Sequence, residues 1–405
     1  MTKIFRIRNA IKTYDWGSTD LIPAFLSEEN TEKKNYAEIW MGAHPNDPSI
    51  AQFDKKKIPL NELIEDFPED TIGTFCKQIF GNRLPYLFKI LAVEHPLSLQ
   101  AHPDKSQAVA GWRKENEAGI PLDEASRNYK DDNHKPEILC ALTPFRALCG
   151  FRQPVEIRQL LDIFDSSDLT GLRETLNQKK EGEALTSFFS RFNGLSSEHK
   201  RSLLDFAANQ AITLQTKDAL NARIWRIVEQ LATSQSADSA VIAPLFLNDI
   251  ELAPGQAIYV PSGILHAYLS GMGVELMANS DNVLRGGLTK KHIDMKELLA
   301  VLRFEPYKPP ILKPSLSNLT GLCYFDIPAA EFRLFELNTL GENERHPLPP
   351  STPSIIIIIE GAFDACCDSD PPISIKKGES VFISASATNP YISGKGLAYI
   401  ASVPS

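Results

Sequence analysis

Several features that mark whole classes of protein are missing from this chain of 405 residues. Its six cysteines are scattered and form no Cys-x-x-Cys pair, so the pattern of a disulfide-rich secreted scaffold is absent. The longest uninterrupted aliphatic run is Ile355 to Ile359, far too short to cross a bilayer. We therefore expect free thiols, a cytoplasmic protein and no membrane partner.

An excess of positive charge is missing as well. Lysine and arginine number 42 against 51 aspartates and glutamates, which gives a net charge of −9. That balance argues against a nucleic-acid partner, and an anionic ligand would have to meet a local basic cluster instead. The length allows two or three domains with real cores. The expected oligomeric state is a monomer.

Proline is missing from one long segment. The chain has 28 prolines, yet none lies between Pro154 and Pro244. Inside this gap, Leu220, Ile224, Ile227 and Leu231 recur at the spacing of an amphipathic helix. A second stretch begins at Ser196 or Ser197, either of which suits a helix N-cap. The gap predicts an all-helical insert over residues 155–238.

The flanking segments read as short strands between turn signals, which is typical of a β-sandwich or barrel. The predicted fold is mainly β with an α-helical insert: two jelly-roll β-domains plus one helical domain. Residues 1–154 and 239–318 form the catalytic β-domain, 155–238 the helical insert, and 319–405 a C-terminal β-domain.

The C-terminal domain contains an echo of an earlier segment. Gly255–Gly271 aligns without gaps to Gly378–Gly394, and both segments begin with glycine, continue as an apolar strand and close on Tyr-aliphatic-Ser-Gly. The position of His266 is taken by Asn389 in the second copy. We therefore predict a repeat of the β-fold that carries no metal.

Two distant stretches look like halves of one metal site. Ser98, Gln100 and His102 are spaced two apart, so on a strand they point to the same side. In the second stretch, the apolar run 257–260 ends in a Pro-Ser-Gly turn, and His266 follows at once. Two strands that offer imidazole to a common interior predict a metal pocket in a β-barrel.

The second stretch closely matches the second motif of the cupin fold, and Gln100-Ala-His102 takes the place of the His-x-His usual in the first cupin motif. Several longer strings resemble one family, the type I mannose-6-phosphate isomerases, and imply two cupin β-domains. The resemblance runs over nearly the whole length, and the strings that carry it are Tyr14-Asp-Trp-Gly17, Ala37-Glu-Ile-Trp-Met-Gly-Ala-His-Pro45, Pro85-Tyr-Leu-Phe-Lys-Ile-Leu91, Leu97-Ser-Leu-Gln-Ala-His-Pro-Asp-Lys105, Asn133-His-Lys-Pro-Glu137 and Glu275-Leu-Met-Ala-Asn-Ser-Asp-Asn-Val-Leu-Arg-Gly286. The resemblance also implies a catalytic β-domain, a helical insert and a C-terminal β-domain, in agreement with the proline distribution.

The resemblance implies one Zn²⁺ per chain, held by Gln100, His102, Glu137 and His266. Imidazole and carboxylate are ordinary zinc donors, and a catalytic site leaves a position open. The implied reaction interconverts mannose 6-phosphate and fructose 6-phosphate through an enediol(ate). We leave His44, His95 and His199 as ordinary core or surface residues.

Proton transfer between C2 and C1 of the sugar requires a general acid/base. Lys135 lies two residues from Glu137 and faces the same pocket on an extended segment, so it is one candidate. The carboxylates Asp281 and Glu275 are the others, and His134 could assist ring opening. We favour Lys135 and Asp281 for the isomerisation step.

Substrate binding has its own candidates. Arg285 matches the family's active-site arginine, and its fork geometry suits an enediolate or a phosphate. Lys291 belongs to a basic run that could bind phosphate, and Ser98 could donate to it. Lys89, Trp16 and Tyr268 are predicted as pocket walls.

Two other functions remain open at this stage. An iron cupin oxygenase would activate O₂, but it usually supplies more imidazole than a site with Gln100 offers. A non-catalytic, sugar-binding cupin would hold a structural metal, but it would not require acid/base groups such as Lys135 and Asp281. The metal content would separate iron from zinc.

Overall fold

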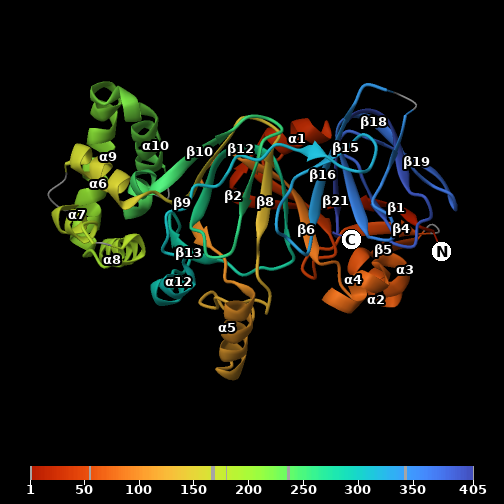
Figure 1. Cartoon of the computed structure of the whole chain (residues 1–405), viewed down its shortest axis with the longest axis horizontal. Helices are drawn as coiled ribbons and strands as arrows, with labels where there is room; N and C mark the ends of the chain where they lie inside the picture. Colours follow the sequence, from red (N-terminus) through yellow and green to blue (C-terminus); the bar gives the residue numbers. More distant parts are fainter. Residues whose placement is uncertain are drawn as a thin grey trace.

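The computed structural model (Figure 1) describes residues 2–53, 56–165, 169–178, 180–234, 238–341 and 344–404. Along the longest axis lie a bundle of helices, a central curled sheet and a second curled sheet. The named strands of both sheets pair antiparallel. At this coarse level the predicted mainly β, cupin-like class is confirmed.

The central sheet has ten strands arranged around the long strand β12 (His266–Ala278), which pairs with four others. The remaining strands are β2 (Ala10–Ser18), β3 (Tyr36–Gly42), β6 (Tyr86–Val93), β7 (Leu99–Ala101), β8 (Glu137–Ala141), β9 (Phe145–Phe151), β10 (Leu247–Leu252), β11 (Ala257–Val260) and β13 (Leu284–Gly287). Because β12 joins β6, β7, β8 and β9, the sheet curls around an interior.

The second sheet has eleven strands, and not all come from the C-terminal part. They are β1 (Ile4–Arg8), β4 (Ile50–Phe53), β5 (Lys56–Pro59), β14 (Ser315–Leu316), β15 (Leu322–Tyr324), β16 (Arg333–Thr339), β17 (Arg345–Pro347), β18 (Ser354–Cys367), β19 (Asp370–Lys376), β20 (Ser380–Ile383) and β21 (Tyr391–Ser402). Residues 1–154 are predicted to belong to the domain of the central sheet, whereas in the structure β1 pairs with β20 of the second sheet. Chain order does not reveal such long-range pairing.

The two sheets pack against each other through one apolar core. Phe88 and Val274 of the central sheet belong to the same buried cluster as Ile355, Ile357 and Phe382 of the second. In the aliphatic run at the start of β18, Ile355 to Ile358 are fully buried, and Ile355 and Ile357 belong to this core. Side chains on the outer face of the central sheet are packed in this core, so those on its other face can line a functional site.

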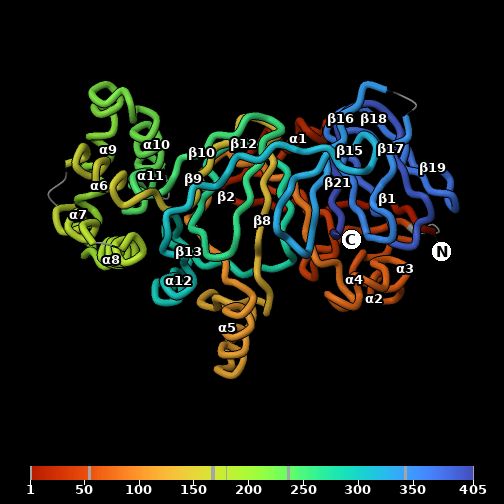
Figure 2. The backbone as a smooth tube through the Cα atoms, viewed as in Figure 1, coloured from red at the N-terminus to blue at the C-terminus, as the bar shows by residue number. Residues whose placement is uncertain are grey.

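The helical insert leaves and rejoins the central sheet through adjacent strands (Figure 2). Because β9 and β10 pair antiparallel, the chain can exit at one strand end and return beside it. The helices are α6 (Pro154–Phe164), α7 (Thr170–Thr175), α8 (Glu181–Asn193), α9 (Ser197–Lys217), α10 (Ala222–Thr233) and α11 (Ala243–Phe246). Ser196 caps α9, accepting a hydrogen bond from His199 N at 3.2 Å. The all-helical character predicted for residues 155–238 agrees with these bounds.

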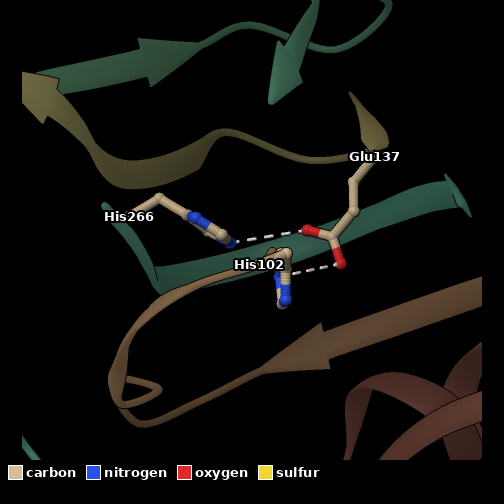
Figure 3. Close-up of side chains that lie close together, drawn as sticks. All are labelled: His102, Glu137 and His266. Carbon is tan, nitrogen blue, oxygen red and sulfur yellow. Dashed lines mark ion pairs between the residues drawn. The ribbon is translucent and has the colours of Figure 1, made fainter. Parts of the chain in front are cut away.

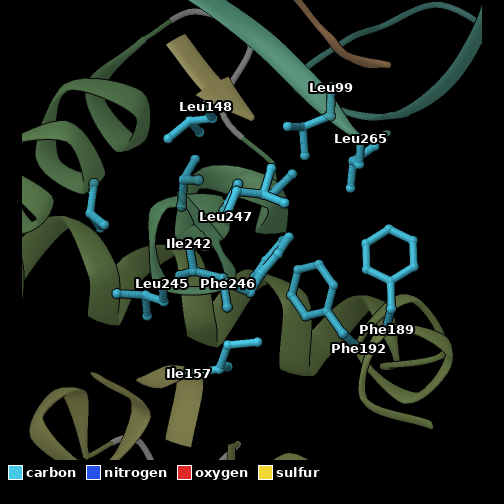
Figure 4. Close-up of a cluster of buried hydrophobic side chains, with 14 of the residues drawn as sticks. Leu99, Leu148, Ile157, Phe189, Phe192, Ile242, Leu245, Phe246, Leu247 and Leu265 are labelled. Atoms are coloured by element: carbon cyan, nitrogen blue, oxygen red, sulfur yellow. The ribbon is translucent and has the colours of Figure 1, made fainter. Parts of the chain in front are cut away.

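One core joins the insert to the sheet (Figure 4). Phe189 and Phe246 of the insert lie in the same cluster as Leu99 and Leu148 of the sheet. The predicted stripe on α10 is wrong at its first member, because Leu220 is 92% exposed in a 3-10 turn before the helix. Burial begins at Ile224, and Trp225 and Val228 complete the buried face.

Shorter helices lie at the edges of the two sheets. They are α1 (Leu21–Leu26), α2 (Leu60–Asp66), α3 (Pro68–Thr71), α4 (Gly73–Phe80), α5 (Lys105–Glu117) and α12 (Met295–Val301). Helix α5 projects from the body (Figure 1). In the described part of the chain, every helix is too short or too polar to cross a bilayer.

Candidate active site

Strand ends of the central sheet bring the predicted metal ligands together. Glu137 begins β8, His266 begins β12, and His102 directly follows β7. On β7, Leu99 and Ala101 face the core shared with the insert, so Gln100 points to the opposite side. The two-residue alternation predicted for this segment is therefore present.

Glu137, His102 and His266 form a compact buried cluster (Figure 3). His102 Nε2 lies 3.4 Å from Glu137 Oε1, and His266 Nε2 lies 3.4 Å from Glu137 Oε2. Candidate ligand atoms of the three residues all lie within 4.8 Å of one another. The side chains are at most 2% exposed, so water does not solvate the carboxylate.

The tautomers of the two imidazoles follow from their other nitrogens. His102 Nδ1 lies 2.7 Å from the Asn282 carbonyl, and His266 Nδ1 lies 2.9 Å from the Ile264 carbonyl. A carbonyl can only accept, so both Nδ1 atoms carry the proton and both Nε2 atoms present a lone pair. Glu137 Oε2 and both Nε2 atoms lack hydrogen-bond partners among the described residues. Three unpaired acceptors facing one another fit a bound cation.

The charge states agree with a cation site. Burial lowers the pKa of His102 to about 4, with Lys135 acting in the same direction, so the ring is neutral. Burial works to raise the pKa of Glu137, but the positive charge of Lys135 outweighs it and holds the pKa well below its usual range. Neutral imidazoles and an ionised carboxylate are the forms that bind metals.

Gln100, the fourth predicted ligand, is a neighbour of the cluster in the sheet. Its register partner on β12 is His266, and its partner on β13 is Arg285. Gln100 also lines the large cavity beside the cluster. An amide oxygen is a neutral donor, so a metal held here would keep more positive charge than in a site with a second carboxylate.

The cluster opens into a cavity of about 1850 Å³ that collects most of the predicted site residues. Those lining it are Trp16, Lys89, Ser98, Gln100, Lys135, Glu137, Tyr268, Glu275, Asp281, Arg285 and Lys291. A hydrophilic ligand of sugar size fits easily within this volume.

Lys89 is the centre of a buried charge network. Its Nζ lies 3.1 Å from Glu275 Oε2 and 3.6 Å from Glu38 Oε1. Trp40 Nε1 donates to Glu38 at 2.7 Å and fixes that carboxylate. Burial alone would lower the pKa of Lys89, but Glu38 and Glu275 raise it above its usual value. Lys89 is therefore a fixed ammonium group within the cavity rather than a simple wall.

The two favoured proton-transfer groups also lie at the cavity. Lys135 Nζ is 2.9 Å from Glu137 Oε1, so it lies directly beside the metal cluster. Asp281 follows β12, and its backbone N–H donates to Asp131 at 2.7 Å. Burial would raise the pKa of Asp281, but His44 and the positive charges of Lys135 and Lys89 lower it.

In the part of the chain that the structure describes, two cations that line the cavity have no carboxylate partner. Among the described residues, neither Arg285 nor Lys291 has a carboxylate within ion-pair distance, although both line the cavity. Lys291 Nζ lies 5.9 Å from the Tyr14 ring centroid, and Tyr14 stacks on Trp16 with centroids 5.6 Å apart. Burial, followed by the charge of Arg285, lowers the pKa of Lys291. A half-buried arginine and an exposed lysine without counter-charges fit an anionic group.

One predicted residue lies elsewhere. His134 is not among the described residues that line the cavity, and its Nε2 lies 2.5 Å from Glu331 Oε1. Glu331 precedes β16 of the second sheet, so His134 is occupied by a contact between the two halves of the molecule. The suggested part of His134 in ring opening is therefore not supported by its position.

Several residues that line the cavity were not predicted as site residues. Glu38 and His44 line the cavity, as does Asn46, which donates to Asp281. A glutamate inside the apolar strand Tyr36–Gly42 was an available signal, because a buried carboxylate needs partners. The residues next to His44 gave no comparable signal, because its partner Asp281 lies far away in the chain.

Known proteins resemble the chain in sequence. The family described as phosphomannose isomerase type I, catalytic domain, matches residues 4–154. Mannose-6-phosphate isomerase of Escherichia coli (strain K12) is 35% identical over 395 residues, which cover 96% of this chain and 97% of that protein. The Homo sapiens mannose-6-phosphate isomerase is 32% identical over 408 residues, covering 95% and 94%.

Solved structures resemble the chain in fold. A zinc-bound crystal structure of mannose 6-phosphate isomerase matches with a TM-score of 0.89 and 33% identity, covering all of both chains. The Salmonella typhimurium enzyme bound to its substrate fructose 6-phosphate and to zinc matches with a TM-score of 0.88 and 33% identity, again over the full length of both.

Proposed function

The chain belongs to the type I mannose-6-phosphate isomerase family, and from this premise we propose how its cavity residues carry out the reaction. The reaction interconverts mannose 6-phosphate and fructose 6-phosphate. The observation that carries the proposal is the buried His-Glu-His cluster, which opens into a cavity with unpaired cations. An oxygenase or a passive sugar-binding protein would not need this combination.

The cofactor is zinc, and its ligands in the proposal are Gln100, His102, Glu137 and His266. The fit rests on the unpaired Nε2 atoms and the unpaired carboxylate oxygen described above. The chemistry that a bound zinc ion supplies is Lewis acidity toward the substrate carbonyl, which makes the neighbouring C–H more acidic.

Proton transfer is assigned to Lys135 and Asp281. Isomerisation removes a proton from C2 of the aldose and returns one to C1, so a group must accept the proton and deliver it again. Asp281 is kept ionised and can accept a proton, while the Lys135 ammonium group lies 2.9 Å from Glu137 and can donate one. Lys89 and Glu275 add a fixed ammonium–carboxylate pair that orients sugar hydroxyls and supports negative charge in the enediolate.

The phosphate is bound by Arg285 and Lys291, with Ser98 as a further donor. Arginine offers two parallel N–H groups to a phosphate, and an adjacent lysine adds a point charge. Trp16 and Tyr268 form apolar walls that limit how the sugar can lie. Anchoring one end of the substrate this way fixes C1 and C2 relative to Lys135 and Asp281.

The division of the chain remains part of the proposal. The central sheet carries the catalysis, residues 155–238 form an inserted helical domain, and residues 319–405 form a second cupin-like domain that uses β1, β4 and β5 from the N-terminal part. The enzyme acts as a monomer on a small sugar phosphate in the cytoplasm. The six cysteines without disulfides support a reducing compartment.

A direct assay tests the function. Purified protein is incubated with mannose 6-phosphate, with and without a chelator, and fructose 6-phosphate formation is followed. The expected result is turnover that a chelator abolishes and added zinc restores, with the metal content of the purified protein measured in parallel. No turnover by zinc-loaded protein would contradict the proposed function, and iron as the native metal would favour an oxygenase.

A further inference from the structure

The carboxylate of Asp281 is held by one short turn of the chain. His44 Nε2 lies 3.3 Å from Asp281 Oδ1, and the Asn46 side-chain amide donates to Asp281 Oδ2 at 3.1 Å. Both residues belong to the turn after β3, so one local structure reaches both oxygens of the carboxylate. Nothing in the proposed reaction uses either residue so far.

The protonation of His44 can be read from its surroundings. The backbone N–H of Asn46 donates to His44 Nδ1 at 3.2 Å, so Nδ1 carries the lone pair. In a neutral imidazole the proton is then on Nε2, which is the atom directed at Asp281. The ring is buried and meets the Trp40 ring edge-on with centroids 4.8 Å apart. His44 is thus a fixed donor whose tautomer is set by a backbone amide.

We propose that His44 and Asn46 are positioning residues, which together hold the Asp281 carboxylate ionised and aimed into the cavity for proton transfer. The proposal rests on the proposed isomerase function, because Asp281 acts on substrate only there. A carboxylate with a nitrogen beside each oxygen, here the donating Asn46 amide and His44 Nε2 at 3.3 Å, is held in one orientation and favours its charged form. The backbone N–H of Asp281 is tied to Asp131 as well, so the whole residue is fixed.

The other charged groups around Asp281 do not replace this contact. Lys135 and Lys89 act on Asp281 through their charges, and Asp131 opposes them with its own. Lys89 is already engaged by two carboxylates and Lys135 by Glu137. Loss of the turn's two donors would therefore leave Asp281 less well oriented and easier to protonate.

The test compares His44→Ala, the conservative His44→Gln, whose amide can replace the Nε2 donor, and Asn46→Ala in zinc-loaded enzyme. His199→Ala, at an exposed position on α9, is the control for loss of a histidine. We expect His44→Ala to lower kcat roughly tenfold, the value of one hydrogen bond to a charged group, with KM and zinc content unchanged. The acid limb of the pH profile of kcat/KM should move to higher pH, and His44→Gln should restore part of both.

Two further measurements separate positioning from general damage. In an Asp281→Asn background, His44→Ala should cause no additional loss of kcat, because its effect passes through that carboxylate. Carboxyl NMR of Asp281 should report a higher pKa in His44→Ala than in the unmodified protein, a readout that needs no turnover. An equal loss of kcat in both backgrounds, or an unchanged Asp281 pKa, would overturn the proposal. Failure of the unmodified enzyme to turn over would instead reject the isomerase function, while the NMR titration would still decide the role of His44.

Discussion

The two curled sheets have similar backbone conformations at matching glycines, but different side chains fill their interiors. Gly255 and Gly378, which open the two copies of the echo, have φ values of 80° and 83°. Gly271 and Gly394, which close it, have φ values of 119° and 147°, and an added Cβ would approach a carbonyl oxygen of a neighbouring chain segment to 2.7 and 2.4 Å. Glycine is thus required at matching places in both.

The interiors are opposite in character. The second sheet encloses an aliphatic cluster with members on β16, β18, β20 and β21, among them Leu337, Ile356, Ile358, Val381, Ile383, Ala398 and Ile400. In the central sheet, an apolar cluster fills only one end, and charged residues with the cavity occupy the other. Among the described residues, one group of three or more His, Cys, Asp or Glu side chains lies close enough together to hold a metal ion, and it consists of His102, Glu137 and His266. The strand framework is therefore compatible with either filling, and the interior side chains decide the function.

The largest effect is expected from exchanging the residues at the matching position of the two copies, His266 and Asn389. His266→Asn gives the central sheet the residue of the second copy and removes a buried imidazole ligand. We expect zinc to be lost and kcat/KM to fall on the order of a thousandfold, because the Lewis acid contributes several kcal/mol to the transition state. Metal analysis and the isomerase assay measure both.

The reverse exchange, Asn389→His, is the matched control. Asn389 is exposed, has a φ of 48° and donates to Asp368 at 2.7 Å, so it does not face a cluster of ligands. A histidine there should bind no second zinc and leave turnover unchanged. A second equivalent of zinc would show that the two interiors are more alike than their side chains indicate.

A core substitution should separate stability from catalysis. Ile356→Ala removes a fully buried side chain of β18, and we expect the free energy of unfolding to fall by about 2–5 kcal/mol. The kcat of the folded fraction should not change, because Ile356 lies in the interior of the second sheet. Urea unfolding and zinc analysis provide the measurements. Ile212→Ala, at a 57% exposed position of α9, is the control, and loss of zinc from folded Ile356→Ala protein would contradict the prediction.

The two cations without carboxylate partners among the described residues offer a milder change. Arg285→Ala should raise KM for mannose 6-phosphate by about tenfold to a hundredfold, since a hydrogen bond to a charged group contributes roughly 1.5–3 kcal/mol. Arg226→Ala removes the same charge from an exposed position on α10 and should leave KM unchanged. Steady-state kinetics at fixed ionic strength distinguish the two. An unaltered KM in Arg285→Ala would show that another group anchors the phosphate.

Local patterns indicated His102 and His266 of the buried cluster, whereas Glu137 entered only through the family resemblance, and the surroundings of the cluster were not predicted. The alternation around Gln100 and the turn before His266 are properties of neighbouring residues, so the sequence alone placed them correctly. The turn that holds Asp281 leaves no such local pattern, because Asn46 and Asp281 are separated by 235 positions in the chain. The same reason explains why β1 was assigned to the central sheet, because strand pairing depends on partners anywhere in the chain.

The smallest effect concerns the contact between the two halves. His134 and Glu331 meet at 2.5 Å, and burial works to raise the pKa of Glu331 while His134 lowers it below its usual value. A carboxyl group with a lowered pKa in the folded state stabilises the protein above its unfolded pKa, and that stability is lost as the pH falls through the folded value. Glu331→Gln should therefore reduce the free energy of unfolding by about 1–2 kcal/mol at neutral pH and by much less in acid.

Urea unfolding at several pH values measures this dependence, with Glu360→Gln at an exposed position of β18 as the control. Because Glu331 and His134 lie outside the cavity lining, kcat should stay the same while stability changes. A fall in kcat with unchanged KM would instead return His134 to the catalytic machinery. In that case the second sheet would contribute to the reaction by holding a residue of the first, and the separation of the two interiors would no longer describe the enzyme fully.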